Sequence, residues 1–201
     1  LSDYKKGSRK AAKMLITASK GSFLLKRRAV TKDVKQQVAV AHSVQRHLSE
    51  HRFPVAGLVD SLEGKSFVEH EGRIYELFRY IKGERFDKTN PAAAEAGRVL
   101  AHFHDLLRDF PEDQILKRTS FHQGKPLLKV IDELPDVLKS KESKENLEGI
   151  DDTVSYLKNQ YAIASKMVED ADFTGMPTGI VHADWHPGNM LYKDGEIIAV
   201  I

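Results

Sequence analysis

The side chains most able to do chemistry gather in one short segment, residues 180–191, which reads IVHADWHPGNML. Its His182, Asp184, His186 and Asn189 form a polar loop between two apolar runs, and this placement indicates a site. Phosphoryl transfer needs a carboxylate that orients and deprotonates the attacking hydroxyl, and an amide or carboxylate oxygen that holds a metal ion on the phosphates. Asp184 and Asn189 could supply both.

The first part of the chain must position this loop, and its patterns predict a small sheet with one helix. Strand patterns cover four segments, residues 12–17, 22–26, 67–68 and 74–81. Ser19-Lys20-Gly21 separates the first two segments and predicts a hairpin, and apolar residues at helical spacing predict a helix within residues 32–51. Polar residues crowd without periodicity from 82 to 90, so we expect two lobes, 1–82 and 83–201.

The second part reads as mainly helical. Asn90 and Pro91 predict a helix start, because asparagine caps free amides and proline suits the first helical turn. Helical patterns follow at residues 125–138 and 154–168, and Asp194-Gly195 between two apolar runs predicts a hairpin after the polar loop. The predicted fold class is α+β, with an antiparallel sheet plus one helix in the first lobe and mainly helices in the second.

The pattern H-x-D-x-x-x-x-N from His182 to Asn189, followed by a short hairpin, resembles the catalytic loop of aminoglycoside phosphotransferases, which share the two-lobe protein-kinase-like fold. The resemblance implies an enzyme that uses ATP and Mg²⁺ to phosphorylate a hydroxyl of a small molecule, as its aminoglycoside-, choline- and homoserine-phosphorylating relatives do. It assigns Asp184 as the catalytic base, places His182 beside it in the catalytic site, and makes Asn189 a ligand of Mg²⁺.

Two upstream segments match further parts of that family. Lys26, which ends the strand-like run Phe23-Leu24-Leu25-Lys26, resembles the lysine that neutralises the triphosphate. Ser8, in Gly7-Ser8-Arg9-Lys10, would lie in the loop over the phosphates, where backbone amides and a short side chain approach closely. Both positions are therefore expected to bind the nucleotide.

Residues 77–83 resemble the family's hinge, an extended linker whose backbone reads adenine. The resemblance assigns backbone groups of Arg79 and Ile81 to the base and the side chain of Phe78 to the rear wall of the pocket. An ordinary edge strand leading into a loop is the alternative for this segment.

Two features depart from the family. A glutamate of the helix after the lysine usually holds that lysine, but here the matching position falls at Ala41 or His42, and the helix has carboxylates only near its ends. A second magnesium-binding aspartate usually follows the hairpin, where this chain ends at Ile201. We therefore expect a trimmed or incomplete chain.

Three alternatives stay open. The two departures favour a non-catalytic, pseudokinase-like module that only binds nucleotide. A metal-dependent hydrolase would instead use His182, Asp184 and His186 as ligands. In a purely structural interpretation, His182 and Asp184 brace the loop through a hydrogen bond and Asn189 caps a turn.

Composition narrows the classes of partner. The 201 residues carry a formal net charge of +2 from many charges of both signs, which gives no one-sided field for nucleic acid. No apolar run approaches the ~20 residues that span a bilayer, and the absence of cysteine excludes disulfides and thiolate metal sites. We expect a cytoplasmic protein whose partner is a small hydroxylated molecule, with neither nucleic acid nor membrane as a partner.

Overall fold

The chain folds into two compact units. One is formed by Leu1–Leu116 together with Gly179–Ile201, and the other by Lys117–Thr178. The computed structural model describes residues 2–3, 11–31, 33–111, 125–140, 148–176 and 178–201. The lobe boundary expected at residues 82 and 83 lies inside the first unit and stays a prediction.

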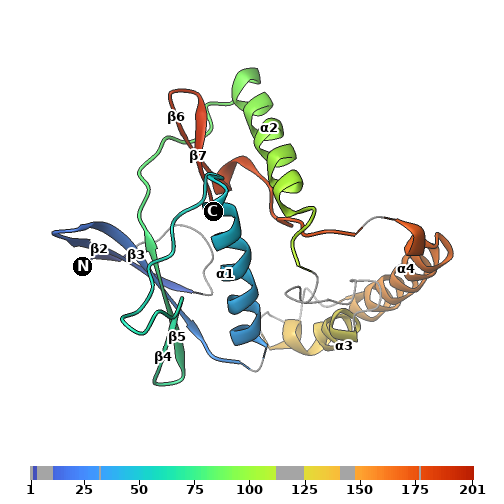
Figure 1. Cartoon of the computed structure of the whole chain (residues 1–201). Helices are drawn as coiled ribbons and strands as arrows, with labels where there is room; N and C mark the ends of the chain where they lie inside the picture. Colours follow the sequence, from blue (N-terminus) through green and yellow to red (C-terminus); the bar gives the residue numbers. More distant parts are fainter. Residues whose placement is uncertain (1, 4–10, 32, 112–124, 141–147, 177) are drawn as a thin grey trace. The chain divides into compact units, whose positions relative to one another are not determined.

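An antiparallel sheet in the order β1-β2-β3-β5-β4 forms one side of the first unit (Figure 1). Its strands are β1 (Ser2–Asp3), β2 (Ala12–Ala18), β3 (Gly21–Ala29), β4 (Val68–His70) and β5 (Arg73–Arg79). The predicted hairpin is confirmed, with β2 and β3 joined at residues 19–20. A second two-residue turn joins β4 to β5, where Glu71 and Gly72 both adopt positive φ, 47° and 66°, the geometry that matches the twist of paired strands.

Helix α1 (Val34–Glu50) confirms the helix predicted within residues 32–51. It buries Val38, His42 and Leu48, and Val38 and His42, one turn apart, lie on one face. His42 contacts Glu76 and the ring of Phe78, two alternate residues of β5 that point to the same face of the sheet. Helix α1 therefore covers the sheet face that carries these side chains.

The hairpin that follows the polar loop consists of β6 (Met190–Lys193) and β7 (Glu196–Val200). Asp194 and Gly195 turn it with positive φ values of 52° and 85°, as the Asp-Gly pair predicts. Backbone bonds tie it to two distant segments: Glu84 and Tyr192 exchange bonds of 2.7 and 2.9 Å, and the Val200 N–H donates to the Pro54 carbonyl at 2.7 Å.

The linker after β5 passes so close to this hairpin that it needs a glycine. A Cβ built on Gly83 would lie 2.8 Å from the Cβ of Leu191 and 3.1 Å from the carbonyl oxygen of Tyr192. Backbone neighbours cannot swing aside as a flexible side-chain end can, so any larger residue here would push the linker off the hairpin.

Helix α2 (Asn90–Leu107) starts where it was predicted, but Asn90 is not its cap. Thr89 has extended backbone angles, and its Oγ1 accepts the Ala92 N–H at 3.3 Å. Asp87 in turn accepts bonds from the backbone and hydroxyl of Thr89 at 2.9 and 2.7 Å. Threonine caps as asparagine does, and this bonded turn fixes it one residue earlier than we expected.

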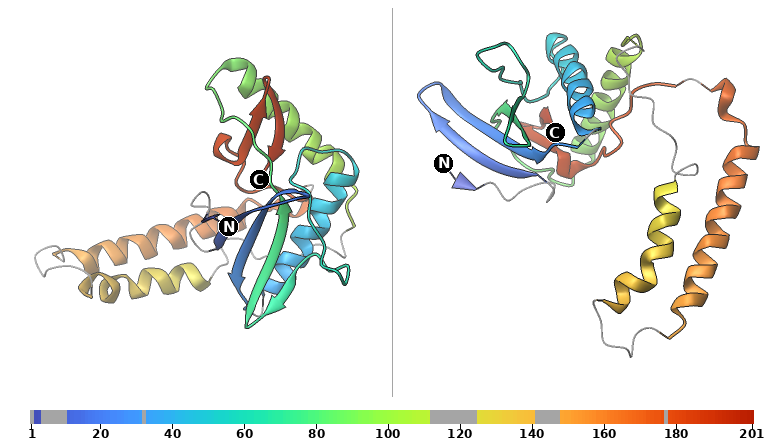
Figure 2. Two further views of the ribbon diagram at one scale, coloured as in Figure 1. Left: turned by 90° about the vertical axis from the view of Figure 1, so that its left-hand side faces the viewer. Right: turned by 90° about the horizontal axis from the view of Figure 1, so that it is seen from below.

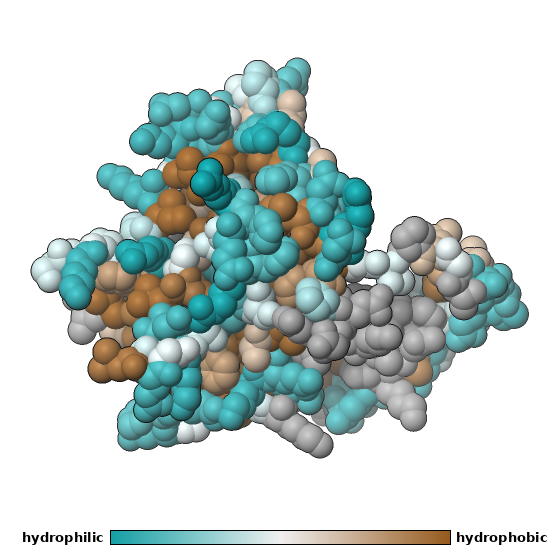
Figure 3. Space-filling model, in the orientation of Figure 1, coloured by the Kyte–Doolittle hydropathy of each residue, from teal (hydrophilic) through white to brown (hydrophobic). Residues whose placement is uncertain are grey.

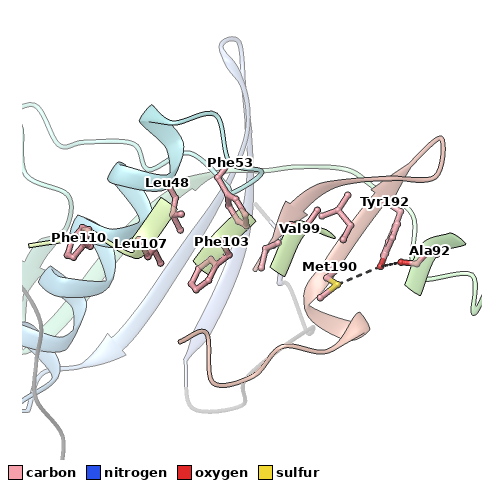
Figure 4. Packing of buried hydrophobic residues seen from close by; sticks show 11 residues of the cluster. Leu48, Phe53, Ala92, Val99, Phe103, Leu107, Phe110, Met190 and Tyr192 are labelled. Atoms are coloured by element: carbon pink, nitrogen blue, oxygen red, sulfur yellow. Dashed lines mark hydrogen bonds between the residues drawn. The ribbon is translucent and has the colours of Figure 1, made fainter. Parts of the chain in front are cut away.

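The core of the first unit lies where the end of α1, helix α2 and the β6–β7 hairpin meet (Figure 4). Its largest buried side chains come from all three, among them Leu48, Phe103 and Tyr192. The Tyr192 hydroxyl donates to the Ala92 carbonyl at 3.3 Å, so its one polar group is paired. Away from this core, partly exposed apolar side chains show among hydrophilic ones over β2 and β3 and beside the hairpin (Figure 3).

The second unit is a helical hairpin. Helices α3 (Lys125–Lys139) and α4 (Ile150–Asp170) lie side by side (Figure 2), and Lys158 forms an ion pair with Asp132 between them. Both helices were predicted, and a short 3₁₀ turn, η4 (Phe173–Gly175), follows them. In the described ranges no helix combines the length and the apolar character that crossing a membrane requires.

Candidate active site

The structure brings Asp184 and Asn189 together. The Asn189 Nδ2 donates to the Asp184 side-chain Oδ2 at 2.7 Å and to its backbone carbonyl at 3.0 Å. The Asp184 side chain is 72% exposed, so its carboxylate meets solvent, where an acceptor hydroxyl can approach. Asn189 ends the 3₁₀ turn η5 (Pro187–Asn189), which folds the chain back so that two residues five apart can touch.

His186 lies beside the same carboxylate. Its Nδ1 accepts the Gly188 N–H at 3.0 Å, and its Nε2 is 3.6 Å from the Asp184 Oδ1. Because Nδ1 is an acceptor, a neutral imidazole here carries its hydrogen on Nε2, toward Asp184. A Cβ on Gly188 would come within 2.6 Å of the His186 Cε1, so a glycine is needed for the ring to adopt this position.

His182 is an inward-facing residue of the loop rather than an exposed one. Its ring meets Trp185 edge-on at a centroid distance of 5.4 Å and Phe103 of α2 at 6.2 Å. Ala183 then adopts φ of 62°, which is unusual for a residue other than glycine and turns the chain sharply toward Asp184. His182 thus anchors the loop on the core, and its catalytic role stays a prediction.

Asn189 is also fixed by the hairpin, since the Ile201 N–H donates to its backbone carbonyl at 2.8 Å. Both side-chain bonds of Asn189 use the amide nitrogen, so its Oδ1 is the atom that suits a hard cation. Mg²⁺ needs only one or two oxygen ligands from protein when phosphates and water complete its shell. Asn189 and Asp184 present oxygens of this kind on one loop, so the residues fit that ion.

Lys26 lies on β3 directly opposite Glu76 of β5 and Lys13 of β2. Glu76 is a buried carboxylate, only 2% exposed. Arg28 holds it with Nη2 3.1 Å from Oε1 and Nε 2.6 Å from Oε2, and the His42 Nε2 lies 3.1 Å from Oε1. The half-buried lysine therefore stands next to a carboxylate that two other side chains hold in place.

Burial and neighbouring charges change the pKa values of Lys26 and Glu76. Burial lowers the pKa of Lys26, Glu76 raises it, and the nearby cations Arg28 and Lys13 lower it further, so that it stays below the ordinary 10.5. Burial alone would raise the pKa of Glu76, but the His42 hydrogen bond and the charges of Lys26 and Arg28 hold it below the ordinary 4.5. Glu76 is thus ionised at neutral pH, and His42 donates to it through Nε2.

In the segment predicted to be a hinge, residues 77–83, two backbone amides are already bonded. The Arg79 N–H donates to the Gly57 carbonyl at 2.8 Å, and the Tyr80 N–H donates to the Ser22 carbonyl at 2.9 Å. In this structure the Arg79 amide is therefore engaged, which leaves its carbonyl and the backbone of Ile81 for the predicted base contacts. The Phe78 ring meets His42 edge-on at 5.9 Å, on the face that α1 covers.

Lys26 and Phe78 lie on strands and Asp184 and Asn189 on one loop, as the sequence predicts, while their roles stay predictions. The sequence analysis did not single out Glu76 or Arg28. Ser8 lies outside the described residues. The available signal was Glu76, which lies between Ile74-Tyr75 and Leu77-Phe78 in the strand RIYELFR, because a charge that is buried among apolar residues must be paired. Its partners come from β3 and α1, too far along the chain to be read from a local pattern.

No set of three or more histidine, aspartate or glutamate side chains within the described ranges could hold a metal ion. His182, Asp184 and His186, the ligands of the hydrolase alternative, are all described and form no such set. The structure therefore gives no geometric support to the metal-dependent hydrolase.

A comparison with the models of known protein families finds one match. The model of the phosphotransferase enzyme family, APH, matches residues 5–201. No curated protein sequence matches the chain.

Solved structures resemble the chain in fold. An amicoumacin kinase in complex with AMP-PNP and Ca²⁺ has a TM-score of 0.68 and 18% identity, covering 100% of this chain and 58% of its own. Spectinomycin phosphotransferase APH(9)-Ia, with ADP and spectinomycin, has a TM-score of 0.62 and 16% identity, covering 100% and 62%. An aminoglycoside phosphotransferase from Alicyclobacillus acidocaldarius has a TM-score of 0.57 and 19% identity, covering 100% and 61%. These likenesses confirm the kinase-like fold class, and the chain spans about three-fifths of the length of these proteins.

Proposed function

Because this chain belongs to the phosphotransferase enzyme family, we propose that it transfers the γ-phosphoryl group of ATP to a hydroxyl of a small molecule. The observation that carries the proposal is the contact between Asp184 and Asn189 in an exposed loop, 2.7 Å from nitrogen to oxygen. One residue is a carboxylate that meets solvent and the other adds an oxygen for a cation, which are the two groups that the reaction requires.

Each residue has a distinct part in this mechanism. Asp184 orients the acceptor hydroxyl and accepts its proton as the oxygen attacks the γ-phosphorus. Asn189 keeps that carboxylate in one orientation and offers its Oδ1 to Mg²⁺, which when bound neutralises charge on the phosphate oxygens. Lys26 offers an ammonium to the same phosphates, and the backbone of residues 79–81 receives the base.

Two of the similar proteins, an amicoumacin kinase and a spectinomycin phosphotransferase, suggest the class of the acceptor. We propose a hydroxylated small molecule of comparable polarity as the substrate. A panel of candidate acceptors should contain aminoglycosides and other hydroxylated antibiotics. It should also contain choline and homoserine, which relatives in the family phosphorylate.

The test compares Asp184→Asn with Asp194→Asn in the full-length protein. Loss of a general base lowers turnover by roughly 10²- to 10⁴-fold, so Asp184→Asn should stop ADP formation on an accepted substrate while MgATP still raises the melting temperature. Asp194→Asn is the matched control, because asparagine suits the positive φ of the hairpin turn. Full turnover in folded Asp184→Asn would refute the proposed mechanism.

The pseudokinase-like alternative gives a different result in the same assays. A nucleotide-binding module would show the MgATP-dependent thermal shift, because ligand binding to the native state raises apparent stability. It would produce no ADP above background with any acceptor, and wild type and Asp184→Asn would be equal. Helix α1 has Ala41 and His42 where a glutamate was expected, and this feature keeps the alternative under test.

A further inference from the structure

Helix α1 offers no carboxylate to Lys26. Glu50 is the one acidic residue between Val34 and Glu50, and it lies at the last position of the helix. The helix residue that faces the lysine's neighbourhood is His42, which is 3% exposed. A charged Lys26 in this half-buried place therefore has to find its counter-ion on another element.

Strand β5 places a carboxylate directly opposite the lysine. Glu76 is paired in register with Lys26, and side chains of directly opposed residues in antiparallel strands lie close together on one face. Ile74 precedes Glu76 on the same face and Phe78 follows it, and Ile74 is fully buried. The carboxylate thus sits within an apolar stripe, where its influence on a neighbouring ammonium is stronger than in water.

Glu76 is clamped rather than free to rotate. Arg28, two residues beyond Lys26 on β3, approaches both carboxylate oxygens, at 3.1 and 2.6 Å. His42 donates to Oε1 at 3.1 Å, and its Nδ1 is 2.9 Å from the Ser66 Oγ. Side chains from β3, α1 and the segment before β4 therefore fix the orientation of the carboxylate.

We propose that Glu76 is the positioning residue for Lys26, and that Arg28 and His42 hold its carboxylate so that it offsets the lysine's charge from strand β5. The inference rests on the proposed nucleotide-binding role of Lys26. The groups around the lysine are Lys13 on β2, Arg28 on β3, Glu76 on β5 and His42 on α1. Glu76 is the acidic member of this set.

A consequence concerns the pH range in which Lys26 is charged. Burial lowers the pKa of Lys26 while Glu76 raises it. A neutral residue at position 76 would remove the raising influence of Glu76 and leave the lowering influences of burial, Arg28 and Lys13, so the pKa of Lys26 would fall further. Affinity for the phosphates would then be lost at a lower pH than in the wild type.

The test measures MgATP affinity of the full-length protein by calorimetry from pH 6 to pH 10. Glu76→Gln should bind roughly tenfold more weakly at neutral pH, the size of one charge-assisted interaction, and its affinity should decline at a lower pH than that of the wild type. Glu69→Gln is the control, because Glu69 is a surface residue paired with Lys35, and it should match the wild type at every pH.

A second variant covers the case in which Glu76→Gln does not fold, as judged by circular dichroism. Glu76→Asp keeps the charge but moves it back by one methylene, so affinity should fall by a few-fold while the alkaline decline stays near that of the wild type. Wild-type affinity in Glu76→Asp, or a folded Glu76→Gln with wild-type affinity and pH profile, would overturn the inference. A wild type that does not bind MgATP would instead refute the proposed function, so the two failures are distinguishable.

Discussion

Two carboxylates in this molecule are each held by nitrogen donors, in opposite surroundings. Glu76 is 2% exposed on β5 and is fixed by Arg28 and His42, far away in sequence. The Asp184 side chain is 72% exposed and is held by Asn189 and flanked by His186, within five residues along the chain. The site around Glu76 is thus built by tertiary contacts, whereas the site around Asp184 is built by one short segment of the chain.

The difference in burial between Glu76 and Asp184 indicates what the neighbours of each carboxylate do. A buried carboxylate without partners would be strongly destabilising, so its clamp is part of the stability of the fold. An exposed carboxylate is solvated with or without its partners, so its neighbours serve orientation more than stability. Three experiments, two with substitutions and one with pH, test whether the two sites differ in this way.

The largest expected effect comes from the core side chain under the loop. Phe103 is 4% exposed and meets the rings of His182 and Trp185, so Phe103→Ala should lower the free energy of unfolding by about 3–5 kcal/mol. Urea denaturation followed by fluorescence measures it. The control Phe173→Ala removes a half-exposed ring and should change stability by less than ~0.5 kcal/mol. A small loss in Phe103→Ala would mean that the loop does not depend on the core.

The two histidines test the contrast directly. His42→Gln removes a 3% exposed ring that bonds both Glu76 and Ser66, and glutamine cannot reach both, so we expect a loss of about 1–3 kcal/mol. His186→Gln changes a side chain that is 52% exposed and should stay within ~0.5 kcal/mol. The same urea experiment measures both variants, and equal losses would erase the distinction between the sites.

The smallest expected effect is a loss of folding stability at low pH. The pKa of Glu76 is held below 4.5 in the folded protein, because the His42 bond and the charges of Lys26 and Arg28 outweigh its burial. Its contribution to stability is therefore present above about pH 4.5 and is lost as pH falls through the folded pKa. Thermal unfolding from pH 6 to pH 3 should show this loss in the wild type, and Glu76→Gln should lack that share of it. Identical acid profiles would show that Glu76 is not charged in the folded state.

The sequence predicted most of what depends on nearby residues. The β2–β3 and β6–β7 hairpins and the four α-helices of the described ranges follow from local periodicity and turn residues, and Asp184 and Asn189 lie on one loop. The Glu76 clamp was not predictable, because the register between β3 and β5 decides that Glu76 stands opposite Lys26. The cap of α2 was placed at Asn90 rather than Thr89, since both residue types can cap and only the turn around Asp87 selects between them.

The backbone bonds that join Tyr192 to Glu84 and Val200 to Pro54 also bear on the order of folding. Strands β2 and β3 can pair as soon as both have left the ribosome, since their contacts are local. The loop that carries Asp184 is fixed only when its hairpin pairs with segments far earlier in the chain, and closing such long loops is slow. During synthesis the sheet that carries Lys26 should therefore form well before the loop that carries Asp184 is fixed, and a ribosome-stalled chain ending before residue 190 would have a folded sheet and an unfixed Asp184 loop.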